Sequence, residues 1–255
     1  MRDRPDIPAM DPDGTEVAFE ISADSERATT LLCGFSRFGL AGLTAVDYLV
    51  DHLEMEPIGH VTTAELPTIT PFEEGTPRHH TRLFARPDLD VVVLVNELFV
   101  PLVAADSLVK SILTWTDTNE IDEIAVLAGV PVPHGPEDHR VFYVATEDFR
   151  ARRLTDVDVP AMGSGFLDGV NASLLARGLD TDLRAGVFLT PVHAQAPDVE
   201  AALRLIDGFE AVYGLDVDSG PLEAFATEVE QYYRELASRL ENVEQAQMPE
   251  DRMYM

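Results

Sequence analysis

Two glycine-rich turns come nearest to known ligand-binding or catalytic patterns. The first, CGFSRFGLAG, follows an apolar run and opens a helical pattern, where α/β proteins place phosphate-binding loops. It lacks the Lys and Ser or Thr that a P-loop needs after its second glycine, and Arg37 stands where a dinucleotide-binding turn needs glycine. Gly34, Gly39 and Gly42 are candidates for a ligand loop; the alternative is that they permit a tight turn and close helix–sheet packing.

The second turn, AMGSGFLDG, resembles the nucleophile elbow of hydrolases, but Met162 stands where that motif requires glycine. Ser164 is therefore a poor nucleophile candidate. Cys33 is the only cysteine, so the chain forms no internal disulfide, and its apolar neighbours favour packing over reactivity.

Asn96 and Glu97 follow the apolar run DVVVLV at the predicted carboxyl edge of a strand, the usual location of ligand sites in open α/β sheets. They are candidate ligand residues and the best foothold for an enzymatic function. The sequence assigns them no mechanism.

The histidines do not form a metal-binding motif. His79 and His80 are adjacent in a predicted strand and point to opposite faces, and Pro136 between His134 and His139 prevents a helical ligand pair. We expect no metal and no cofactor.

Acidic residues dominate the charge: 46 Asp and Glu against 18 Lys and Arg give a net charge of −28, and Lys110 is the only lysine. Such an excess repels itself unless salt screens it, which favours a halophilic-type protein from a salt-rich cytoplasm over an ordinary acidic one. Without a basic stripe, nucleic acid is not an expected partner. The chain has no apolar run long enough to span a membrane and begins without a secretory signal, so we expect a cytoplasmic protein.

Short β-branched runs alternate with stretches of helical period, which predicts an α/β protein with a largely parallel sheet. Strands are expected at EVAFEI, TTLLCG, IGHVTT, TRLFA, DVVVLV, IDEIAVLAG, HRVFYVA and DLRAGVFLT. Helices are expected at GLAGLTAVDYLVDHL, PLVAADSLVKSILTWT, FLDGVNASLLARG and DVEAALRLIDGFEAVYG.

A last helix is predicted within 217–247, where apolar residues recur every three or four positions. Its stripe either docks on the core or pairs with the same helix of another subunit. We therefore expect an α/β domain over 1–216, this helix over 217–247 and a flexible tail over 248–255.

Three stretches resemble the PAC2 family, which contains the proteasome assembly chaperones. They are LLCGFSRFGLAGLTAVDYLVDHL, GSGFLDGVNASLLARGLDTDLRAGVFLTP and DVEAALRLIDGFEAVYGLDVDSGPLEAFATEVEQ. The resemblance implies a three-layer α/β/α fold like that of nucleoside phosphorylases, with no established catalytic role. The chain departs from the usual glycine turn at Ser36 and Arg37, where relatives often have proline and glycine.

The ending MPEDRMYM adds to this resemblance. Archaeal members can end in a hydrophobic residue, tyrosine and any residue (the HbYX motif), positions held here by Met253, Tyr254 and Met255. In proteasome activators such a tail enters a pocket between neighbouring α-subunits, where a basic residue meets the terminal carboxylate. Because one tail binds weakly, a homo-oligomer that presents several would gain avidity.

The expected function is a non-enzymatic proteasome assembly chaperone or adaptor whose tail docks on the α-ring of the core proteasome. Its partners would be free α-subunits or the finished core particle. One alternative is a phosphorylase or hydrolase-like enzyme on nucleosides or other small metabolites, suggested by the fold and the glycine turns. Another is a structural oligomer with a tail that binds nothing.

The charge balance predicts that the fold is markedly less stable in dilute buffer than in multi-molar KCl, because salt screens the repulsion between carboxylates. Thermal unfolding at a series of KCl concentrations measures this dependence. Equal melting temperatures in dilute and concentrated KCl would show that the acidity has another cause.

Overall fold

The computed structural model describes residues 17–24, 28–67, 69–86, 88–193, 197–215 and 217–227. The chain divides into two compact units, Met1–Val217 and Asp218–Met255. In the second unit, residues 220–227 are helical, with Pro221 in the first turn. The rest of the helix predicted within 217–247, together with the tail, lies outside the described residues.

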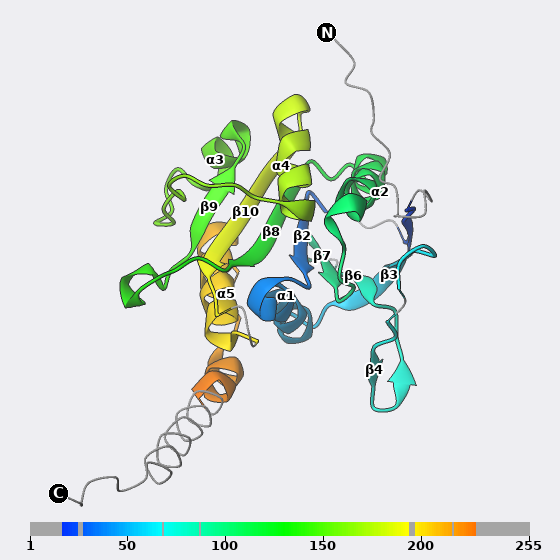
Figure 1. Cartoon of the computed structure of the whole chain (residues 1–255), viewed down its shortest axis with the longest axis horizontal. Coiled ribbons are helices and arrows are strands. Elements are labelled where there is room, and N and C mark those ends of the chain that lie inside the picture. Colours follow the sequence, from blue (N-terminus) through cyan, green and yellow to red (C-terminus); the bar gives the residue numbers. More distant parts are fainter. Residues whose placement is uncertain are drawn as a thin grey trace, which may run out of the picture. The chain divides into compact units, whose positions relative to one another are not determined.

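An eight-stranded mixed sheet forms the centre of the first unit, in the order β1-β3-β6-β7-β2-β8-β10-β9 (Figure 1). The four strands β7, β2, β8 and β10 are parallel, and antiparallel pairs flank them at both edges. The strands are β1 Glu20–Ala23, β2 Thr30–Phe35, β3 Glu56–Thr62, β6 Thr81–Ala85, β7 Val91–Asn96, β8 Glu123–Val130, β9 Phe142–Ala145 and β10 Arg184–Pro191.

Helices cover both faces of this sheet, which confirms the three-layer α/β/α prediction. On one face α1 packs beside α5, and on the other α2 packs beside α4 (Figure 1). The helices are α1 Ala41–His52, α2 Ala105–Thr118, α3 Glu147–Arg153, α4 Gly169–Asp180 and α5 Val199–Tyr213, with single turns η1 Phe38–Leu40, η2 Leu102–Ala104 and η3 Pro136–Asp138. None of the helices in the described residues has the length and apolarity needed to cross a bilayer.

The central strands are apolar on both sides because both of their faces are covered. Every residue of β2 and of β7 is buried. In β2, Leu31 and Cys33 belong to the core cluster that also contains side chains of α2 and α4. On the opposite side of the same strand, a Cβ at Gly34 would overlap Val46 of α1. The predicted runs TTLLCG and DVVVLV therefore correspond to strands at the middle of the sheet.

One helix and one two-stranded hairpin were not predicted. The helix α3 contains one fully buried side chain, Phe149, so its sequence has no apolar period to reveal it. A small hairpin, β4 Phe72–Glu73 and β5 Thr76–Pro77, turns through Gly75 at a φ of +79°. The first strand was placed too early, at EVAFEI rather than Glu20–Ala23.

A buried carboxylate joins several elements at the amino end of the parallel strands. Glu123, the first residue of β8, has its side chain 1% exposed. Its Oε1 accepts hydrogen bonds from Arg153 Nε at 2.8 Å, Tyr213 Oη at 2.9 Å and Thr30 Oγ1 at 3.2 Å. Arg184 Nε lies 3.5 Å from the other oxygen. Burial raises the pKa of the Tyr213 phenol, which therefore remains a donor at neutral pH.

Replacing Glu123 by Gln is expected to lower the free energy of unfolding by about 3 kcal/mol, because it leaves clustered guanidinium groups without their shared counter-charge. Urea unfolding followed by circular dichroism measures this change.

Asp122→Asn is the matched control, since it removes the neighbouring, half-exposed partner of Arg184 and is expected to cost about 0–1 kcal/mol. Equal losses in the two variants would contradict a special role for the buried carboxylate.

Candidate protein-binding surface

The first glycine turn lies where β2 ends and α1 begins, at the carboxyl edge of the parallel strands. A Cβ at Gly34 or Gly42 would overlap neighbouring atoms, because α1 packs directly on β2 and β8. Gly39 has a φ of +63°, in the left-handed region that glycine adopts without strain. Its carbonyl oxygen accepts a hydrogen bond from the Asp198 backbone N–H at 2.8 Å. Tight packing and turn geometry therefore account for all three glycines.

An ion pair brings the two glycine turns of the sequence together. Arg37 Nη2 in the first turn lies 2.7 Å from Asp168 Oδ1 in the second. Gly169 follows with a φ of +59°, and a Cβ there would overlap the Arg37 guanidinium. Arg37 thus connects the start of α4 to the turn after β2.

A pocket of 520 Å³ opens beside this ion pair. Three segments that end or begin at the carboxyl edge line it: the first turn, the loop after β7 and the start of α4. Its residues are Ser36, Arg37, Phe38, Leu40, Phe99, Val100, Leu102 and Asp168. The lining is mainly apolar, and its one carboxylate, Asp168, is paired with Arg37.

Large apolar side chains stand exposed around this pocket. Phe99 is 67% exposed, and Phe166, just before Asp168, is fully exposed. Together with Phe38, Leu102 and Val103, they make up five of the ten exposed large hydrophobic residues of the described chain, and we call these five the carboxyl-edge apolar surface. Clustered exposed apolar side chains of this kind are typical of sites that bind a protein, a membrane or a ligand.

Asn96 and Glu97 lie at this edge, but the fold already bonds their polar groups. Asn96 is buried; its Oδ1 accepts from Thr81 Oγ1 at 2.7 Å, and its Nδ2 donates to the Leu98 carbonyl at 2.7 Å. Glu97 accepts from Arg78 at 3.1 Å and from Arg82 at 3.4 Å. These interactions join β6, β7 and the loop after β7.

The remaining catalytic candidates are dispersed. Ser164 is exposed in the irregular segment before α4. Cys33 is fully buried and burial raises the pKa of its thiol, which confirms that it is a packing residue.

The histidines are placed differently from the prediction. His79 and His80 precede β6 rather than lying in it, and His79 stacks on His60 with ring centroids 3.7 Å apart. The rings of His134 and His139 are 5.2 Å apart, and that of His193 lies 5.1 Å from His134. Within the described residues, no group of His, Cys, Asp and Glu has a geometry that could hold a metal ion.

The sequence correctly predicts that the first glycine turn follows a strand and opens a helix and that Asn96 and Glu97 end a strand, but it does not reveal the apolar surface nearby. The predicted helix that begins at Pro101 includes Leu102 and Val103, the next predicted helix begins at Phe166, and Phe99 belongs to no predicted element. The candidates Met253, Tyr254 and Met255 lie outside the described residues.

Comparison with solved structures finds the same fold in several proteins. One is the crystal structure of Pyrococcus furiosus PbaA, an archaeal homolog of proteasome-assembly chaperone, with a TM-score of 0.80 and 20% sequence identity. The match covers 90% of this chain and 95% of the PbaA chain. Pyrococcus furiosus PbaB, an archaeal proteasome activator, gives 0.72 and 18%, covering 86% and 99%. A PAC2 family protein from Streptomyces avermitilis gives 0.61 and 18%, covering 82% and 96%.

No curated protein sequence matches this chain at a significant level. The model of the PAC2 family matches residues 31–237. Because this range is well over half of the 255 residues, the chain belongs to the PAC2 family.

Proposed function

We propose that this protein is a non-enzymatic proteasome assembly chaperone or adaptor of the cytoplasm. The observation that carries the proposal is the joint occurrence of a PAC2 body and the C-terminal sequence Met253-Tyr254-Met255. The solved structures with this fold include a homolog of a proteasome-assembly chaperone and a proteasome activator. The expected partners are proteasome α-subunits or the core particle.

The tail has the chemistry for docking in a pocket that ends in a basic residue. The terminal carboxylate offers a charge that no internal sequence has, and Tyr254 adds apolar area and a hydroxyl. Because ordering a single tail offsets much of what its contacts gain, we propose that a homo-oligomer presents several tails at once. The acidic, halophilic-type charge balance would then keep such an assembly soluble in a salt-rich cell.

The carboxyl-edge apolar surface supports a second contact with an α-subunit. A chaperone for incomplete assemblies has to cover apolar surfaces that will later lie between subunits, and exposed phenylalanines suit that role. A phosphorylase would instead need free polar groups at this edge, whereas those of Asn96 and Glu97 are bonded within the fold. We therefore favour protein binding over the nucleoside-enzyme alternative.

Removing Tyr254 and Met255 is expected to reduce capture of α-subunits and core particles by at least about tenfold, the effect of losing roughly 1.4 kcal/mol of binding free energy. Pull-downs from the same cell with the full-length and the shortened protein measure this. A variant that keeps the length but carries Glu250→Ala serves as the control. Unchanged capture by the shortened protein would rule out tail docking.

Phe99→Ser with Phe166→Ser is expected to weaken binding to free α-subunits while the melting temperature stays within a few degrees, since both side chains are exposed. Ile69→Ser with Phe72→Ser, exposed apolar residues outside this surface, is the matched control and should bind normally. Light scattering gives the oligomeric mass of each variant. A loss of mass in the first variant with unchanged α-subunit binding would assign this surface to self-association instead.

A further inference from the structure

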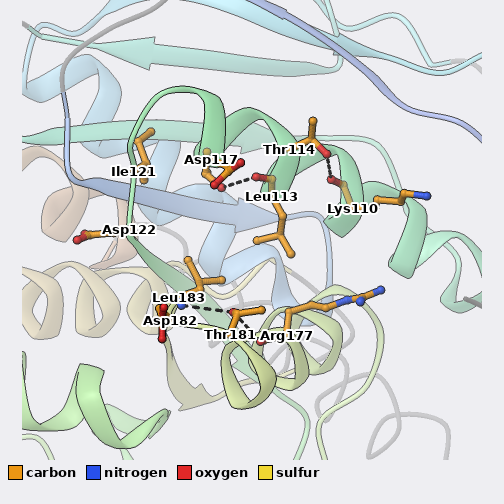
Figure 2. Close-up of a pocket in the computed structure, with 11 residues that line it drawn as sticks. Lys110, Leu113, Thr114, Asp117, Ile121, Asp122, Arg177, Thr181, Asp182 and Leu183 are labelled. Carbon is orange, nitrogen blue, oxygen red and sulfur yellow. Dashed lines mark hydrogen bonds between the residues drawn. The ribbon is translucent and has the colours of Figure 1, made fainter. Parts of the chain in front are cut away.

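A second pocket, of 630 Å³, lies between α2 and α4 at the amino end of β8 and β10. It is therefore at the opposite end of the parallel strands from the carboxyl-edge apolar surface. Figure 2 shows its lining, to which Leu113, Ile121 and Leu183 contribute apolar side chains. The volume lies within the range of about 300–1,000 Å³ that small-molecule sites occupy.

Two cations line one side of this pocket. Lys110 is the only lysine of the chain, and the Arg177 side chain extends from the facing helix toward the same side of the view (Figure 2). In the part of the chain that the structure describes, neither side chain forms an ion pair. Arg177 stands in the last turn of α4, where the helix dipole favours a cation, but Lys110 stands in the middle of α2, where it does not.

Three carboxylates line the other side. In Figure 2, Asp117, Asp122 and Asp182 lie at separate places, all to the left of the two cations. Asp122 is bound to Arg184, whereas the side chains of Asp117 and Asp182 form no ion pair within the described residues. The cations thus lie on one side of the lining and the carboxylates on the other, with Leu113 and Leu183 between them; Thr114, Thr116 and Thr181 complete the lining.

We propose that this pocket binds short peptides with both termini free. A terminal carboxylate fits beside Lys110 and Arg177, where it would receive the counter-charge that these cations lack. A terminal ammonium would lie on the other side, beside Asp117 or Asp182. A simple anion would use only the positive end, and a fatty acid would place an apolar chain against carboxylates, which is unfavourable.

The apolar side chains of the pocket determine which central side chain a bound peptide would have. Leu113 from α2 and Leu183 from the loop before β10 lie on opposite walls of the pocket. Ile121, from the loop between α2 and β8, adds a third apolar side chain. A central aliphatic or aromatic side chain would bury its surface against them, which contributes binding free energy in proportion to the area covered. Tripeptides such as Ala-Leu-Ala and Ala-Phe-Ala match this pattern.

The test uses the full-length protein labelled in its leucine methyl groups and titrated with Ala-Leu-Ala and Ala-Phe-Ala. Saturable chemical-shift changes are expected at Leu113 and Leu183, with none at Leu205, which is fully buried in α5. N-acetylation or C-amidation of the peptide is expected to weaken binding about tenfold each, because each removes one of the two charges.

The double variant Lys110→Met with Arg177→Met is expected to bind the free peptides about tenfold more weakly. It is also expected to bind peptides with a free and with an amidated carboxyl end equally well. Arg150→Met is the matched control, because Arg150 is an exposed arginine of α3 without an ion pair in the described residues. The methyl spectrum without peptide shows whether each variant is folded.

Three results would overturn the proposal. The first is the absence of saturable shifts with both free peptides. The second is equal affinity for free and capped peptides, and the third is full affinity in the double variant. None of these results depends on proteasome binding, so the peptide site and the chaperone role stand or fall separately.

Discussion

The buried carboxylate of Glu123 is the interaction on which the arrangement of layers depends. An isolated carboxylate in the interior is strongly unfavourable, so this position is tolerated only because donors surround it. The donors Arg153, Tyr213 and Thr30 come from α3, α5 and β2, three elements that are distant in sequence. With Arg184 of β10 beside its other oxygen, this one side chain connects β2, β10 and two helices to the amino end of β8. The loops around the carboxyl-edge apolar surface lie at the opposite end of the strands.

At the carboxyl end of the parallel strands, glycines and one ion pair hold the elements together. Gly34 and Gly42 let α1 lie directly against β2 and β8, and in the turn that connects them Phe38 is exposed. The Arg37 to Asp168 ion pair then holds the start of α4 beside the same turn. Apolar side chains such as Phe99 and Phe166 are left exposed on a chain with a net charge of −28. On so acidic a chain, this surface is suited to contact with another protein rather than with solvent.

The sequence predicts the middle of the fold well because burial on two faces leaves a simple pattern. The runs of β2 and β7 are continuous and apolar, and glycines mark the turns between strand and helix. Single contacts are harder: Arg37 and Asp168 are 131 residues apart and no local pattern links them. The same holds for Asn96, whose position at a strand end suggests a ligand, while its neighbour in space, Thr81, occupies its carbonyl oxygen.

The few cations of this chain sharpen the distinction between its structural and its ligand-binding groups. In the described residues most arginines serve the fold through ion pairs with carboxylates, namely Arg37, Arg78, Arg82, Arg86, Arg152, Arg153 and Arg184. Five described cations form no ion pair, namely Lys110, Arg140, Arg150, Arg177 and Arg204. What distinguishes Lys110 and Arg177 from the other three is that they line the same pocket, so a single anionic group could contact both. Carboxylates are so abundant on this chain that a pair of them does not indicate a site. Two cations without ion pairs in the lining of one pocket do indicate a site for an anionic group.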